Sequence, residues 1–220
     1  MVGRENFEDK LKQVESLIVR FAKMTQTQLT DAVEVLYQSD VDRALAVIEK
    51  DKELDKLDFE INETAILLIA RQQPVATDLR RLVVALRISS DLERMADNAK
   101  NIAKSTIHLG KDHGIKIHDS VKEMKEIAIK MIDISIIAYE NEDITLARKL
   151  SEMDDVIDNM YSTMLRELLE ETATNPQKIQ HIMQMAFSGR YVERIGDHAT
   201  NIGEDVMYLV KGGESADLNE

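Results

Sequence analysis

The sequence contains an internal repeat. Residues 93–102 (ERMADNAKNI) return 100 positions later as residues 193–202 (ERIGDHATNI), and six of the ten positions are identical. A period close to half the chain length indicates a fold built from two copies of one structural unit. Polar residues kept in both copies indicate chemistry that the two copies share. We therefore expect two similar halves, each with a polar site on the repeated segment.

Both halves show helical periodicity. Apolar residues recur at helical spacing in residues 7–37, 41–71 and 79–109 of the first half, and in residues 121–139, 144–172 and 179–210 of the second. The chain has only two prolines, Pro74 and Pro176, and each lies between the second and third helical segments of its half. The sequence predicts an all-α fold: two tandem, pseudo-symmetric three-helix bundles of long antiparallel helices, packed side by side.

Short polar or glycine-containing segments set the expected boundaries. We expect residues 1–112 to form the first three-helix repeat, residues 113–213 the second, and residues 214–220 a flexible acidic tail. Gly110 and Gly114 mark the linker between the repeats. Ser39 or Asp40 is expected to cap the second helix, and Thr77 or Asp78 the third.

Charge and composition exclude several classes of protein. The chain has 41 acidic and 28 basic residues, a formal charge of −13, so it should not bind nucleic acid. It has no cysteine, which excludes disulfides, thiolate zinc sites and iron–sulfur clusters. Residues 1–8 lack the apolar core of a signal peptide, and no apolar stretch is long enough to span a bilayer. We expect a soluble, cytoplasmic protein without membrane insertion.

Pairs of acids four residues apart are the candidate site residues. Such a pair lies on one face of a helix, where like charges destabilise the helix by about 0.2 to 0.5 kcal/mol. Their number carries no information, because about 7 to 8 are expected by chance in so acidic a chain and eight occur. Their positions do carry information, because four of the pairs, two in each half, occur at matching places in the two halves. These pairs are Asp51/Asp55, Glu93/Asp97, Asp154/Asp158 and Glu193/Asp197.

The duplicated pairs should converge within each half. Pro74 lies 19 residues after Asp55 and 19 before Glu93, so antiparallel helices place these acids at one level. Pro176 lies 18 residues after Asp158 and 17 before Glu193. Four carboxylates at one level are an oxygen-ligand site for a divalent cation. The sequence therefore predicts one metal cluster in each half.

Other polar residues near the acid pairs have several interpretations. Asn101, Asn201 and His198 lie on the repeated segments and are expected to support the clusters, as are Asp78 and Arg80, while Arg94 and Arg194 supply adjacent positive charge. In a plainer interpretation, the acids form solvated helix faces balanced by basic residues. In another, each Asp–Asn pair positions a water against an acyl-phosphate on a signalling partner. The chain lacks a Glu-x-x-His motif, a glycine-rich phosphate loop and a nucleophile elbow, so classical enzymes are disfavoured.

Three segments resemble the PhoU family of phosphate-specific transport accessory proteins: residues 73–80 (QPVATDLR), 91–97 (DLERMAD) and 191–199 (YVERIGDHA). The resemblance covers essentially the whole chain. It implies a cytosolic, non-enzymatic negative regulator of the phosphate-starvation response and modulator of phosphate uptake. It also implies an adaptor between the ATPase subunit of the phosphate ABC transporter and a phosphate-sensing histidine kinase, and a homodimer. The alternatives are a phosphatase-like regulator of a two-component system and a purely structural helical scaffold.

The resemblance further implies metal clusters bound through Glu/Asp-x-x-x-Asp motifs. The ion would be divalent or trivalent, with iron, zinc, magnesium and manganese as the possibilities. Ala96 stands where the family motif has the glycine seen at Gly196, and the segment Asp78-Leu79-Arg80 has no counterpart in the second half. We therefore expect the two halves to bind metal unequally.

Overall fold

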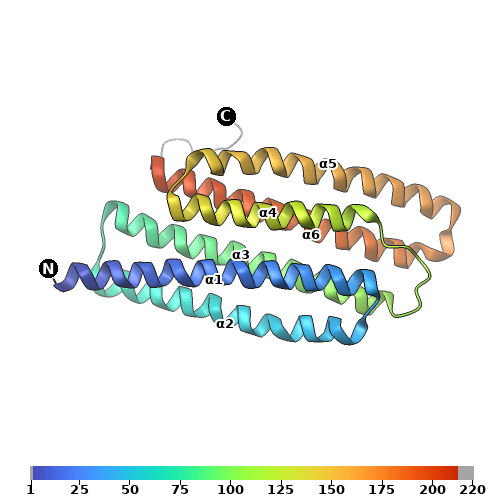
Figure 1. Cartoon of the computed structure of the whole chain (residues 1–220), viewed down its shortest axis with the longest axis horizontal. Helices are drawn as coiled ribbons and strands as arrows, with labels where there is room; N and C mark the ends of the chain where they lie inside the picture. The colour runs from blue at the N-terminus through green and yellow to red at the C-terminus, as the bar shows by residue number, and fades with distance from the viewer. Residues whose placement is uncertain (1, 213–220) are drawn as a thin grey trace.

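The structure, a computed structural model, describes residues 2–212 of the chain and the side chains of residues 7–212, and consists of six long α-helices and one turn of 3₁₀-helix (Figure 1). The predicted all-α fold is confirmed. The expected tail, residues 214–220, lies outside the described residues. The helices are α1 (Val2–Gln38), α2 (Val41–Gln72), α3 (Ala76–Leu109), α4 (Asp119–Asn141), α5 (Ile144–Thr174) and α6 (Ile179–Lys211), and η1 (Pro176–Lys178) precedes α6.

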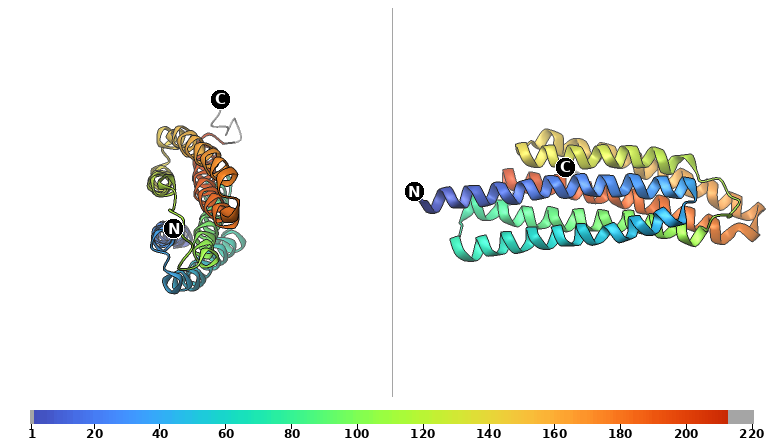
Figure 2. Two further views of the ribbon diagram at one scale, coloured as in Figure 1. Left: turned by 90° about the vertical axis from the view of Figure 1, so that its right-hand side faces the viewer. Right: turned by 60° about the horizontal axis from the view of Figure 1, so that its bottom comes forward.

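The six helices form two three-helix bundles that lie side by side, as predicted. Helices α1–α3 pack together, α4–α6 pack together, and α3 of the first bundle lies along α6 of the second (Figures 1 and 2). Helix α1 also contacts α4. The connection between the bundles runs from the end of α3 at Leu109 to the start of α4 at Asp119. None of these helices carries an apolar run long enough to cross a bilayer.

The two bundles share one hydrophobic core. A single cluster of buried apolar side chains includes Phe21 of α1, Met95 and Ile102 of α3, Met131 of α4 and Val192 of α6. Because α3 and α6 are buried against their own bundle and against each other, the repeated segments that they carry are held rigidly. The core therefore fixes the positions of the polar residues on these two helices.

The helix starts agree with the sequence at one expected position and differ at another. Asp40 caps α2, since its side chain accepts a hydrogen bond from the backbone N–H of Arg43 at 3.0 Å. The predicted cap of α3 by Thr77 or Asp78 is wrong, because α3 already begins at Ala76 and its N-cap residue is Val75, which makes no side-chain capping bond. Asp78 lies in the first turn of α3, where its negative charge faces the positive end of the helix dipole.

Candidate metal centre

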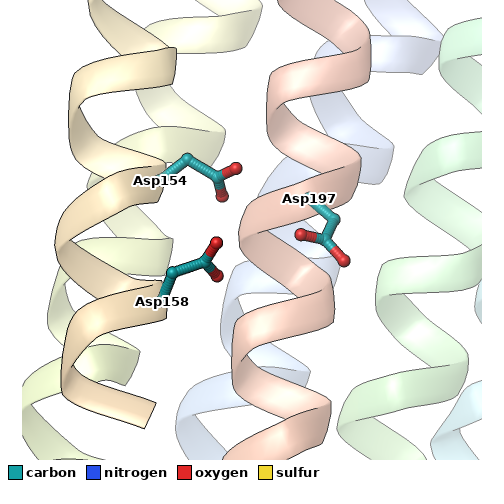
Figure 3. Close-up of side chains that lie close together, drawn as sticks. All are labelled: Asp154, Asp158 and Asp197. Carbon is teal, nitrogen blue, oxygen red and sulfur yellow. The ribbon is translucent and has the colours of Figure 1, made fainter. Parts of the chain in front are cut away.

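Three acids of the second half converge between α5 and α6. Asp154, Asp158 and Asp197 each offer a carboxylate oxygen, and these oxygens all lie within 4.8 Å of one another. Figure 3 shows Asp154 and Asp158 pointing from α5 toward α6, the helix that carries Asp197. In the described part of the chain, no other group of acids or histidines meets this spacing. We call Asp154, Asp158, Asp197 and the adjacent Glu193 the second-half cluster.

A glycine on α6 allows the close approach of Asp154. A Cβ atom at Gly196 would lie 3.0 Å from Asp154 Oδ1 and 3.3 Å from the side chain of Ile157. Because Gly196 directly precedes Asp197, the missing side chain brings the α5 acid against the α6 backbone next to the α6 acid. Ile157 is fully buried, so the acids lie beside a buried apolar side chain.

Two oxygens of the second-half cluster are buried without a partner. The Glu193 side chain is only 8% exposed; its Oε1 pairs with Arg190, whereas its Oε2 has no hydrogen-bond partner. Asp154 Oδ1 is also buried and unpartnered. Leaving such an acceptor unsatisfied costs about 1 to 3 kcal/mol, and more when the group is charged. The one cation paired with the cluster, Arg190, therefore leaves two buried acceptor oxygens without a partner.

Burial and mutual repulsion raise the pKa values of three carboxyl groups in this cluster. Burial, followed by the negative charges of Asp197 and Asp158, raises the pKa of Asp154 to about 7. Burial and the charge of Asp197 raise the pKa of Glu193 to about 7, although Arg190 opposes this shift. The pKa of Asp158 is raised as well, first by burial and then by Asp197. A bound cation would favour the ionised form of all of them.

These observations fit an oxygen-ligand metal site. The donors are carboxylates from two adjacent helices, two of their oxygens lack any other partner, and the glycine at position 196 leaves room for Asp154. Hard cations such as magnesium, manganese and iron prefer this donor set. The residues that would hold the ion are Asp154, Asp158, Glu193 and Asp197.

In the first half, two of the corresponding acids already pair with a positively charged side chain. The ammonium of Lys100 lies 2.5 Å from Asp51 Oδ2 and also pairs with Asp97. Gln28 donates a hydrogen bond to the other oxygen of Asp51, Oδ1, at 3.0 Å. Burial lowers the pKa of Lys100, but its hydrogen bonds to Asp51 and Asp97 outweigh burial and hold that pKa above its ordinary value. We call Asp51, Asp55, Glu93, Asp97 and Lys100 the first-half cluster.

The other two acids of the first-half cluster are more open. Asp55 is exposed, and Glu93 is partly buried. Burial, followed by the negative charges of Asp97 and Asp58, raises the pKa of Glu93. Asp58, which the acid pairs did not predict, accepts a hydrogen bond from Ser89 Oγ at 2.6 Å. In the first half, Lys100 therefore pairs with two of the acids, Asp51 and Asp97, while Asp58 pairs with Ser89.

Two expected supporting residues of the second half contact the opposite bundle. His198 Nδ1 lies 2.8 Å from Asp91 Oδ1, and Asn201 Nδ2 donates to the same oxygen at 3.2 Å. Since an ionised carboxylate only accepts hydrogen bonds, His198 carries its proton on Nδ1. Asp91 is on α3, so this network connects α3 to α6 instead of supporting the acids on α5.

Replacing Asp91 with alanine should destabilise the contact between the bundles. The substitution leaves His198 and Asn201 without their shared acceptor in a part-buried interface, so we expect the free energy of unfolding to fall by about 1 to 3 kcal/mol. Urea unfolding followed by circular dichroism measures the change. Asp91→Asn keeps an acceptor oxygen and should lose less. Equal stability of Asp91→Ala and the unmodified chain would contradict this role.

The remaining expected residues lie away from both acid clusters or on the surface. Arg94 and Arg194 are exposed, and Asn101 accepts a hydrogen bond from Lys104 at 3.2 Å. Arg80 donates to the carbonyl of Leu209 at 3.3 Å and lies over the ring of Tyr208. Arg80 therefore anchors the end of α6.

Comparison with known protein families matches the same two units. The family model described as the PhoU domain matches residues 18–106 and again residues 121–206. The chain belongs to the PhoU family. Each match falls within one three-helix bundle, so the duplication seen in the sequence is a tandem pair of PhoU domains.

Curated PhoU relatives match over nearly their full length. The chain is 37% identical to the phosphate-specific transport system accessory protein PhoU homolog of Clostridium acetobutylicum, with 99% of both chains covered. It is 36% identical to the corresponding homolog of Aquifex aeolicus, with 92% of both chains covered. These relatives span both halves, so the tandem arrangement extends through the whole chain.

Solved PhoU structures share the fold. The crystal structure of PhoU from Pseudomonas aeruginosa is 32% identical and superposes with a TM-score of 0.88, covering 94% of this chain and 99% of that one. The structure of the phosphate transport system regulatory protein PhoU from Streptococcus pneumoniae has a TM-score of 0.86 at 24% identity, covering 94% and 98% of the two chains. The second likeness shows the fold alone.

Three residues that contact the acid clusters or connect the bundles, Lys100, Asp91 and Asp58, were not predicted from the sequence. The sequence does contain a signal for the pairing of Lys100 with Asp97, because Lys100 lies three residues after Asp97 on the same helix. The matching position of the second half is Thr200. The sequence contains no signal for the contact between Asp91 and His198. Tyr191 stands at the position that matches Asp91, so the repeat does not mark this acid. Asp58 is likewise not duplicated.

Proposed function

We propose that this protein is a metal-binding cytoplasmic regulator of phosphate transport. It would act as an adaptor between the ATPase subunit of a phosphate ABC transporter and a phosphate-sensing histidine kinase, and repress the phosphate-starvation response while phosphate is plentiful. Support for the phosphate role comes from the PhoU relatives, which are named phosphate-specific transport system accessory proteins. Support for the metal comes from one observation, the unpartnered buried oxygens of the second-half cluster.

The bound ion would connect two helices of the second bundle. Asp154 and Asp158 belong to α5, whereas Asp197 belongs to α6, so an ion held by these three acids joins the helices, and Glu193 of α6 offers its unpartnered Oε2 beside them. When bound, the ion supplies the positive charge that relieves repulsion among these carboxylates. The ligands would all be carboxylate oxygens. Such ligands favour magnesium, manganese or iron, and zinc can also bind them.

The surface charge of the chain suits basic partners. With a formal charge of −13, the long helical surface attracts basic patches on a transporter ATPase or a kinase, and it also favours rapid association. No phosphate-transfer chemistry is required of such an adaptor, which would act by binding. A second copy of the chain would complete the functional unit as a homodimer.

Removing two ligands should abolish metal binding. The double substitution Asp154→Asn with Asp197→Asn deletes one carboxylate from each helix, so we expect the metal content of protein purified without chelator to fall to background. Elemental analysis by mass spectrometry measures the content. The exposed Asp155→Asn is the matched control, because Asp155 adjoins Asp154 on α5 and should leave the metal content unchanged. A double variant that keeps its metal would contradict the site.

Deleting the gene tests the regulatory part of the proposal. In high phosphate, we expect a deletion strain to express the phosphate-starvation genes that the parent strain represses, and the unmodified gene to restore repression. A reporter fused to a phosphate-regulated promoter measures the response. If expression stays low in the deletion strain, the chain is not the repressor.

A further inference from the structure

The two acid clusters differ in where their positive charge lies: Lys100 pairs with acids on two helices, whereas Arg190 pairs with Glu193, an acid of its own helix. In the first half, Lys100 pairs with Asp51 and Asp97, whereas the matching position of the second half, 100 residues later, is Thr200. Thr200 donates its hydroxyl to the backbone of Gly196 at 3.3 Å and brings no charge. Arg190, whose counterpart 100 residues earlier is Ser90, does bring a positive charge to the second half, but it pairs with Glu193 and so does not take the place that Lys100 has between Asp51 and Asp97.

Helices α1 and α4 also differ, because α1 supplies a hydrogen-bond donor to its acid cluster at a position where α4 has an apolar side chain. Gln28 of α1 donates to Asp51 Oδ1, and the residue 103 positions later, in the register that aligns Asp40 with Asp143, is Met131. Met131 is fully buried and has no N–H or O–H to offer. Asp154, the counterpart of Asp51, therefore keeps an unpartnered oxygen, whereas both oxygens of Asp51 have partners.

The ammonium of Lys100 occupies the position that a metal ion would need. It contacts carboxylates from α2 and α3 together, as the ion of the second half would contact α5 and α6. The Lys100 side chain is only 19% exposed and Asp51 is 7% exposed, so the pair is screened from water. A divalent ion could enter only against the repulsion of this cation, at short range and with little solvent screening.

We propose that Lys100 is a built-in cation that takes the place of the metal ion in the first half. The residue at position 100 or 200 then decides whether its half binds metal, so one chain carries one metal centre, in the second half. This inference rests on the metal centre of the proposed function. Because the lysine is covalently attached, its positive charge stays between Asp51 and Asp97 whatever the metal supply, whereas the second half responds to that supply.

Exchanging the two residues tests the inference. The variants are Lys100→Thr and Thr200→Lys, and the probe is Mn²⁺ alone, added to chelator-treated protein and followed by calorimetric titration and elemental analysis. We expect Lys100→Thr to bind about twice as much Mn²⁺ per chain as the unmodified protein, since a second set of carboxylates becomes free. Thr200→Lys should lose the Mn²⁺ that the unmodified protein binds.

Two controls isolate the effect of the charge. Lys104→Thr removes an exposed lysine one turn further along α3 and should leave Mn²⁺ binding unchanged. Lys100→Arg keeps the positive charge and should keep the first half closed to Mn²⁺. Thermal unfolding gives a second readout, because Mn²⁺ should raise the melting temperature of Lys100→Thr by more than it raises that of the unmodified protein. If Lys100→Thr does not fold, Thr200→Lys still carries the test.

The outcomes separate this inference from the proposed function. If the unmodified protein binds Mn²⁺ and Lys100→Thr binds no more, the role of Lys100 is overturned while the second-half centre stands. If only Lys100→Thr binds Mn²⁺, Lys100 does block the first half, but the second-half centre is overturned, and with it the single centre per chain that this inference states. If neither protein binds Mn²⁺, both are overturned.

Discussion

Replacing Lys100 with methionine is expected to lower the free energy of unfolding by about 3 to 5 kcal/mol when measured in chelator, because it leaves a buried charge without its partner. The Asp51 side chain is 7% exposed, and one of its two oxygens has Lys100 as its partner. Asp97, the other partner of Lys100, is 46% exposed and can be solvated instead. The loss therefore comes mainly from Asp51.

A double variant distinguishes the charge from the packing of the lysine stem. Adding Asp51→Asn to Lys100→Met removes the uncompensated charge, so we expect it to recover most of the loss, whereas a packing defect would persist. Lys104→Met removes an exposed lysine from the same helix and should change stability little. Urea unfolding with chelator present measures all four proteins. A loss under about 1 kcal/mol for Lys100→Met would show that the pair contributes little.

Phe21→Ala is expected to destabilise the protein by about 3 to 5 kcal/mol, through lost burial and the cavity that it leaves. Phe21 is fully buried in the core that both bundles share. The same substitution at Phe59 of α2, whose side chain is 67% exposed, should change stability by less than about 0.5 kcal/mol. Comparing the two separates the effect of burial from the effect of deleting a phenyl ring.

The Phe21→Ala experiment also tests whether the shared core makes the bundles cooperative. Because one cluster of buried side chains spans both halves, we expect unmodified protein and variant to unfold in one transition with the same denaturant dependence. Urea unfolding monitored by circular dichroism and by tyrosine fluorescence measures this. Two separate transitions in the variant would show that the halves fold independently.

The sequence predicted the architecture because the period and the helical spacing act over long segments. Six apolar patterns, two prolines at matching places and one repeated motif suffice to place six helices in two bundles. The start of α3 was missed because the position of a helix end depends on a few backbone angles around Val75 and Ala76, which the apolar pattern does not report. Such ends are decided by local geometry.

The candidate site was only partly predictable for a different reason. Register predicts which acids share a level, and it placed Asp154, Asp158 and Asp197 correctly relative to one another. It does not predict what fills the space between them. Lys100 reaches Asp51 through a flexible four-carbon stem, so its partner follows from the packed structure and not from its position on the helix.

The burial of α3 and α6 has a consequence for how each half of the chain depends on the other. Fifteen residues of α3 and 16 of α6 are buried, against eight of α2 and five of α5. A unit made of α1–α3 alone would expose the face of α3 that α6 now covers. Each unit therefore depends on a second three-helix unit to cover that helix, and in this chain the other half takes that place.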